Sequence, residues 1–165
     1  LKFNLLNYLS YNSSFNQISD VFKSAGMAMM SSMGGASGAL FGTLFMNGGK
    51  TLDGEETLNS DGLKSFLNAA NEGVKSRGGA SPGDKTMIDA LEPAAKEASE
   101  NISLPLYELI SLVSQAADRG KEESKDMIAT MGRAKTLGER SLGHPDAGAC
   151  SVAIILKSMS EFINQ

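Results

Sequence analysis

The chain has 165 residues, a net charge of −4, and 41% hydrophobic and 21% charged residues, which suits one compact domain over residues 1–165. No stretch approaches the roughly 20 apolar residues of a membrane span and no basic patch is present, so we expect neither a membrane nor a nucleic acid as partner. The single cysteine, Cys150, excludes an internal disulfide framework, and without a signal-like start we expect a cytoplasmic protein.

Five windows carry apolar residues at helical spacing. The five stripes are, in chain order, Ile18, Val21, Phe22, Ala25 and Met29; Leu63, Phe66, Leu67, Ala70 and Val74; Met87, Ile88, Leu91, Ala95 and Ala98; Leu106, Leu109, Ile110, Val113 and Ala117; and Val152, Ile155, Leu156, Met159 and Phe162. We expect Ser60 to cap the second helix and Asp84 to cap the third. Because no window alternates as a strand would, we predict an all-α fold, either a helical bundle or a helical barrel.

Three glycine-rich segments interrupt this pattern, at residues 33–45, 76–87 and 132–149. Glycine is a poor interior helix former, so its clustering predicts tight turns, positive φ angles or a close approach of the backbone to another group. The segment 48–62, in contrast, is expected to be a solvated loop without a function.

The first glycine-rich segment is a candidate anion site. The stretch Gly34–Gly38 precedes an apolar helical run, so backbone N–H groups and the helix dipole would point at the same place, and Ser37 could add a hydroxyl. Small-residue packing between crossing helices explains the same letters. The segment lacks the Lys-Ser/Thr ending of a P-loop and follows no predicted strand, so neither common nucleotide motif applies.

The third segment concentrates charged residues, with Arg133, Glu139, Arg140, His144 and Asp146 within fourteen positions. Arginine suits the recognition of phosphate or carboxylate. Two simpler roles stay open: Asp146 as the N-cap of the last helix and His144 as a structural hydrogen-bonding residue.

Other polar and sulfur-containing residues have simple explanations. In the middle segment, we expect Lys85 to point into water behind the capping Asp84. Cys150 and the nine methionines are interpreted as packing residues.

Taken in order, the three segments resemble the signature stretches of the nucleotide-binding L subunit, or C-terminal nucleotide domain, of dihydroxyacetone kinases. They read GGASG followed by LFGT, RGGASPGDKTMIDAL followed by Pro93, and GRAKTLGERSLGHPDAGA. The resemblance covers residues 18–165. It implies a barrel of antiparallel helices, with ADP or ATP held by loops at one end, and a separate ketose-binding K subunit as partner.

Motif matching carries the family's nucleotide contacts onto this chain. The implied contacts are Ala36, Ser37, Gly78, Met87, Arg133, Asp146, Ala147 and Gly148. The family commonly reads Asp-Pro-Gly at the last turn, where this chain has Ala147, so a backbone contact is kept but the turn is less rigid. We identify no catalytic residue in this chain and expect the base that activates the substrate hydroxyl in the K subunit.

The resemblance also implies Mg²⁺, held by an Asp-rich stretch ahead of the first segment. The only acid among the first thirty-two residues is Asp20, and one aspartate cannot supply such a cluster. We therefore expect no metal ligands in this chain and poor phosphoryl transfer by it alone. Because the sequence starts at Leu1 rather than at a methionine, we favour a missing upstream segment.

Two other functions remain as alternatives. One is a catalytically inactive, nucleotide-binding paralogue with a regulatory role, and the other is a plain helical interaction module. The resemblance leaves open whether ATP or a phosphohistidine protein of the phosphotransferase system donates the phosphoryl group. It also leaves open which short ketose accepts the group, and the oligomeric state, a homodimer included.

Overall fold

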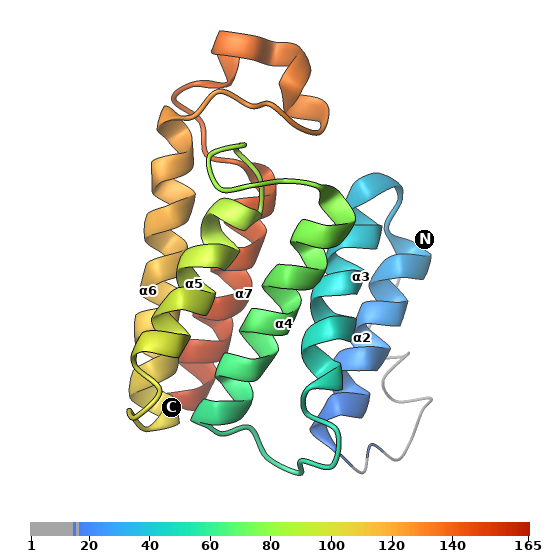
Figure 1. Ribbon diagram of the computed structural model, residues 1–165, viewed down its shortest axis with the longest axis vertical. Helices are drawn as coiled ribbons and strands as arrows, with labels where there is room; N and C mark the ends of the chain where they lie inside the picture. Colours follow the sequence, from blue (N-terminus) through green and yellow to red (C-terminus); the bar gives the residue numbers. More distant parts are fainter. Residues whose placement is uncertain (1–14, 16) are drawn as a thin grey trace. The chain divides into compact units, whose positions relative to one another are not determined.

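The computed structural model describes residue 15 and residues 17–165, and among them every regular element is a helix. The all-α prediction is therefore confirmed, and none of the described helices is long and apolar enough to cross a bilayer. The chain divides into two compact units, one ending at Gly78 and the other running from Gly79 to Gln165. Within each unit, successive α-helices run antiparallel (Figure 1). That residues 1–165 form one domain, and that the helices form a barrel, remain predictions.

The first unit contains α2 (Ile18–Ser32), α3 (Gly35–Lys50) and α4 (Ser60–Gly78), and α3 packs against both of the others. Its three helices meet at a cluster of aromatic rings. The ring centroid of Phe66 lies 4.6 Å from that of Phe22 and 6.4 Å from that of Phe45. A Cβ on Gly48 would lie 2.6 Å from the ring of Phe66, so this glycine lets the ring approach α3.

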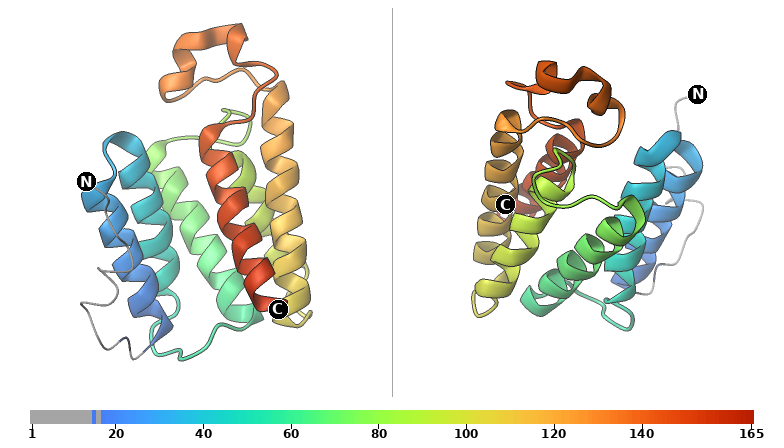
Figure 2. Two further views of the ribbon diagram at one scale, coloured as in Figure 1. Left: turned by 180° about the vertical axis from the view of Figure 1, so that it is seen from behind. Right: turned by 45° about the horizontal axis from the view of Figure 1, so that its top comes forward.

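The second unit contains α5 (Ile88–Glu100), α6 (Leu106–Glu123), the short 3-10 helices η1 (Ser124–Asp126) and η2 (Arg133–Ser141), and α7 (Ala147–Ile163). The helix α6 packs against α5 and α7 (Figure 2). A Cβ on Gly120 would lie 2.0 Å from the carbonyl oxygen of Asp89, so α5 and α6 touch through their backbones. The core side chains buried almost completely are Ile88, Leu91, Leu109, Ile110, Val113 and Val152.

Two predicted stripes differ from the buried faces. On α7 the buried residues are spaced as positions 149, 152, 153 and 156, and Phe162, predicted to be in the core, is 76% exposed because this stripe ends before the last turn. On α2, Val21 is exposed and the buried positions are Ser19, Gly26 and Ala28. The two helices approach closely here, since a Cβ on Gly26 would lie only 2.9 Å from the carbonyl oxygen of Gly42 on α3. The face of α2 that meets α3 therefore has room only for small residues.

The helix caps predicted at Ser60 and Asp84 are wrong. The cap of α4 is Asn59, whose Oδ1 accepts a hydrogen bond from the N–H of Gly62 at 2.7 Å, while Ser60 is already the first helical residue. Asp84 does not cap α5. Instead Asp89, inside the first turn, accepts hydrogen bonds from the N–H groups of Gly83 and Thr86.

The segment 48–62 is a solvated loop only in part. Its first three residues belong to α3 and its last three to α4. Between them Leu52 is buried, whereas residues 53–57 are exposed. The prediction therefore overlooked the apolar anchor that fixes this loop to the first unit.

Candidate functional site

The turn between α2 and α3 presents the start of a helix that no side chain caps. Gly34 occupies the N-cap position without a side-chain hydrogen bond, Gly35 has a φ of +70°, and the first turn contains no acid. Ala36 and Ser37 follow and are exposed. The N–H groups of this turn and the positive end of the helix dipole are therefore available to an anion such as a phosphate.

Gly38 has a different role from the glycines before it. A Cβ at this position would lie 2.1 Å from the carbonyl oxygen of Met33, so only glycine lets the turn close so tightly. A Cβ on Gly34 would meet nothing within 4 Å. The packing explanation thus holds for Gly38, and the anion-site explanation is compatible with residues 34–37.

Gly78 is the last residue of α4 and lies at the same end of the first unit as the start of α3 (Figure 1). A Cβ on Gly78 would lie 3.2 Å from Cδ2 of Leu40, in the second turn of α3. The structure therefore brings Ala36, Ser37 and Gly78, three of the predicted contacts, to one end of this unit.

The predicted contacts of the second unit also share one end of it, where α5 and α7 begin and α6 ends (Figure 1). Met87 occupies the N-cap position of α5 and is only 5% exposed. A Cβ on Gly148 would lie 3.0 Å from Cβ of Met87, so the starts of α5 and α7 touch. Ala147, next to Gly148 in the chain, is exposed. Arg133 is exposed as well, and it begins η2 directly after Gly132, which has a φ of +61°.

Asp146 caps α7, the simpler of the roles that the sequence left open for it. Its Oδ2 accepts a hydrogen bond from the N–H of Ala149 at 2.8 Å, and its own N–H donates to Oγ of Ser124 at 2.9 Å. Burial raises the pKa of this carboxyl above its usual value, against the lowering effect of the N–H groups of Ala149 and Gly148. Because the carboxylate occupies the start of α7, this helix is less open to a phosphate than α3 is.

Lys85 is the residue of this region that sequence reasoning missed. Its side chain is not in water: the residue is 3% exposed and has a φ of +59°. The ammonium donates to the carbonyl oxygens of Ser141 and His144, each at 2.7 Å, of Ser124 at 2.8 Å and of Met127 at 3.1 Å. We call these four carbonyl oxygens the carbonyl cage of Lys85. Nothing in a turn sequence tells whether a lysine will meet water or carbonyl groups, so no local signal could have revealed the cage.

Asp84, next to Lys85 in the chain, forms a second link, to Thr130. Oγ1 of Thr130 donates to Oδ1 of Asp84 at 2.6 Å, and the backbone N–H of Thr130 donates to the carbonyl oxygen of Asp84 at 3.3 Å. The hydrogen bond from Thr130 lowers the pKa of the Asp84 carboxyl. The middle glycine-rich segment is thus hydrogen-bonded to Thr130 through Asp84, and to the third glycine-rich segment through Lys85.

Other charged residues of the third segment have no such role. Glu139 and Arg140 are exposed on η2, and the side chain of His144 is exposed as well. It is the backbone carbonyl of His144 that the structure uses, as an acceptor for Lys85.

The described residues do not fit a magnesium site. No three side chains of His, Cys, Asp or Glu among them come together as a group able to hold a metal ion. The remaining residues, 1–14 and 16, contain no Asp or Glu. Since Mg²⁺ binds through carboxylates and phosphates, we assign no chemical step in this chain to it.

A cavity of about 370 Å³ lies in the first unit but contains none of the predicted contacts. Its lining residues are Met30, Thr43, Met46, Asn47, Lys50, Gly73, Ser76 and Arg77. The cavity therefore gives no independent support to the nucleotide site.

Comparison with known proteins gives a consistent result. A model of the DAK2 domain matches residues 4–161. The chain is 42% identical over 142 residues to the ADP-binding subunit of the PEP-dependent dihydroxyacetone kinase 1 of Listeria innocua, which covers 86% of this chain and 67% of that relative. It is 37% identical over 144 residues to the ADP-binding subunit of the PEP-dependent dihydroxyacetone kinase of Escherichia coli, covering 85% and 68%. It is also 32% identical over 141 residues to the L-erythrulose 1-kinase of Mycolicibacterium smegmatis, covering 86% and 25%.

Proposed function

Because this chain belongs to the DAK2 domain family, we propose that it is the nucleotide-binding, phosphoryl-transfer subunit of a kinase for dihydroxyacetone or a related short ketose. Family membership confirms the resemblance read from the three glycine-rich segments. The observation that supports a nucleotide site most directly is the uncapped start of α3, which leaves backbone N–H groups available beside the exposed Ser37. The names of the two ADP-binding relatives support ADP or ATP as the ligand.

Six of the eight predicted contacts can be given a role that suits their surroundings. The turn at Ala36 and Ser37 would bind phosphate oxygens through its N–H groups and hydroxyl, and the exposed guanidinium of Arg133 would supply a positive charge. The carboxylate of Asp146 accepts a hydrogen bond at the start of α7 and has no donor to offer a phosphate. It therefore suits a hydroxyl or amino donor of the nucleotide. Gly78 and Met87 would each contact the nucleotide without a polar group.

The transfer itself needs a partner. In the proposed reaction, the bond between the terminal phosphorus and ADP breaks, a new bond forms to a ketose hydroxyl, and the hydroxyl proton leaves to a base on the K subunit. Among the residues that the structure describes, we identify none as that base. The relatives named as PEP-dependent support a phosphohistidine protein as the source of the phosphoryl group, and the erythrulose kinase among the relatives keeps tetruloses as candidate substrates.

The regulatory paralogue is the weaker alternative. It would keep the nucleotide site and lose transfer, and the described residues indeed contain no carboxylate cluster. The relatives reported above, however, are all named as kinases or kinase subunits, so they favour the kinase. A plain interaction module is the least favoured, because it gives no reason for the family match.

Calorimetric titration of the chain with ADP tests the proposal. We expect a dissociation constant in the micromolar range, and weaker binding of adenosine, because adenosine lacks the phosphates that α3 would hold. No binding at millimolar ADP would contradict the proposal, and equal binding of adenosine and ADP would remove the start of α3 from the site.

A further inference from the structure

The ammonium of Lys85 ties together the two ends of a segment, residues 124–146, that contains two of the proposed nucleotide contacts, Arg133 and Asp146. We infer that Lys85 is a positioning residue for nucleotide binding, which holds residues 124–146 in the conformation that presents Arg133. This inference rests on the proposed function, because it gives the segment a nucleotide to meet. It assigns Lys85 no contact with the nucleotide, since the side chain is buried among backbone carbonyls.

The four acceptors come from three places along the chain. Ser124 and Met127 lie within and directly after η1, Ser141 is the last residue of η2, and His144 lies in the turn before α7. Arg133 is located between these anchor points, at the start of η2. The middle of the segment is exposed, so its conformation depends on how its two ends are held.

The chemistry of the cage makes the ammonium hard to replace. An ammonium has three N–H donors and no acceptor, so it can serve several carbonyl oxygens at once, whereas an apolar side chain can serve none. If the donor is removed, these carbonyl oxygens are left buried beside an apolar group, a state that proteins avoid. The segment is then expected to rearrange until water reaches them.

The backbone conformation of Lys85 also supports this inference. A φ of +59° is costly for a residue with a Cβ and easy for glycine. A strained conformation that is kept at such a position suggests that the side chain itself is needed. The neighbouring hydrogen bond between Thr130 and Asp84 also joins residues 124–146 to the turn before α5. This segment is therefore held by one buried contact, at Lys85, and one exposed contact, at Asp84.

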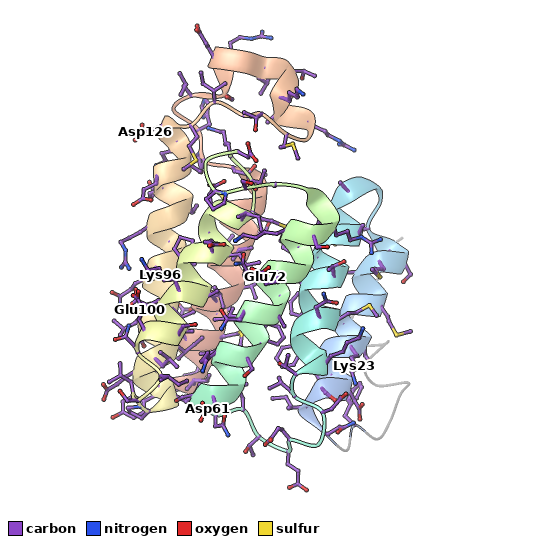
Figure 3. All side chains as sticks on the ribbon, in the orientation of Figure 1. Lys23, Asp61, Glu72, Lys96, Glu100 and Asp126 are labelled. Atoms are coloured by element: carbon purple, nitrogen blue, oxygen red, sulfur yellow. The ribbon has the colours of Figure 1, made fainter. Side chains whose placement is uncertain are left out.

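The first test compares Lys85→Met with Lys96→Met. Lys96 is an exposed lysine on α5, one turn from Glu100, and serves as a matched control for the loss of a surface charge (Figure 3). For Lys85→Met we expect ADP binding to weaken about tenfold by calorimetry, an effect the size of one lost hydrogen-bonded contact. Hydrogen exchange of residues 124–146 should rise in this variant while far-UV circular dichroism stays unchanged, and Lys96→Met should match the starting protein in all three measurements.

The second test asks whether the ammonium itself is required. In Lys85→Ala, n-propylammonium can occupy the place of the deleted side chain and donate to the same carbonyl groups, whereas tetramethylammonium cannot donate. We expect n-propylammonium, but not tetramethylammonium at equal concentration, to restore ADP binding and the exchange protection of residues 124–146. A general loss of stability would not respond to one cation and ignore the other.

The outcomes separate this inference from the proposed function. If the starting protein binds ADP and Lys85→Met binds it within twofold, the inference is overturned and the proposed function stands. If the starting protein does not bind ADP, the proposed function fails first. If neither Lys85→Met nor Lys85→Ala folds, the NMR signal of the Lys85 ammonium in the unaltered protein decides. A change of its chemical shift on saturation with ADP supports the inference, and an unchanged chemical shift overturns it.

Discussion

Neighbouring glycines in the turn before α3 serve different purposes, and the space around each one tells which. Gly38 touches the backbone of Met33, whereas Gly34 has open space and a φ of −76°, which any residue adopts. A sequence pattern of repeated glycines cannot distinguish these two situations. The consequence can be measured by adding a single methyl group at each position.

We predict that Gly38→Ala lowers the free energy of unfolding by roughly 1–3 kcal/mol, because the new methyl group would overlap the carbonyl oxygen of Met33 and force the turn to open. Gly34→Ala is the matched control and should change stability little. Urea denaturation of both variants measures the difference. Equal stabilities would mean that the tight contact at Gly38 does not form in solution.

Arg133 is the exposed cation that we place against the nucleotide. Arg133→Ala should weaken ADP binding about tenfold, since a charge-assisted hydrogen bond contributes roughly 1.5–3 kcal/mol. Arg119→Ala, which removes an exposed arginine paired with Glu97 on the packed helices α5 and α6, should bind ADP as the unaltered chain does. Calorimetry on the two variants decides, and unchanged affinity in Arg133→Ala would remove this residue from the site.

The starts of α3 and α7 show how two similar elements can differ in what they can bind. Both follow a glycine-containing turn, but α3 begins without a side-chain cap, whereas α7 begins with the carboxylate of Asp146 on its N–H groups. The helix dipole is therefore already neutralised in part at α7. Because the cap of α7 is a titratable carboxyl, the stability of the protein should depend on pH through it.

The pKa of Asp146 is raised in the folded protein, chiefly by burial, so the folded state holds this proton more tightly than the unfolded chain does. Stability therefore falls as the pH rises from the unfolded value of 3.8 towards the folded one. Asp146→Asn keeps the cap but does not ionise. We predict that its melting temperature, relative to the unaltered chain, increases between about pH 3 and about pH 7.

Asp146→Ala provides the contrast, because it removes the cap itself and should cost roughly 0.5–2 kcal/mol even at low pH. Thermal melts across the same pH series compare the two variants. A relative melting temperature of Asp146→Asn that decreases with pH would show that the hydrogen bonds, and not burial, dominate the titration of this carboxyl.

For the molecule as a whole, the proposed site has donors for phosphate but no described carboxylate cluster for a metal ion. We predict that magnesium tightens ADP binding to this chain by less than about threefold, because no protein ligand would complete the coordination of the ion. Titrations with and without Mg²⁺ measure this, with a family member that carries the Asp-rich stretch as comparison. A tenfold or larger gain in this chain would reveal metal ligands that we have not identified.

The sequence by itself determined that the protein is helical and which family it belongs to. Apolar spacing and the capping of α7 by Asp146 depend on residues three or four positions apart, so they can be read locally. The three glycine-rich segments identified the family, because their letters and order are specific together. The same local reasoning misplaced two caps: the neighbouring Asn59 takes the role predicted for Ser60, and the N-cap position predicted for Asp84 belongs to Met87, which makes no side-chain cap.

Only the tertiary structure decided which side chains meet. The acceptors of Lys85 lie 39 to 59 positions away along the chain, so its burial depends on the path of a whole segment. The same is true of Gly48, which the sequence placed in a solvated loop and which the structure packs against the ring of Phe66. Contacts between distant residues depend on how helices pack, and packing is a property of pairs of surfaces that no single stretch of sequence contains.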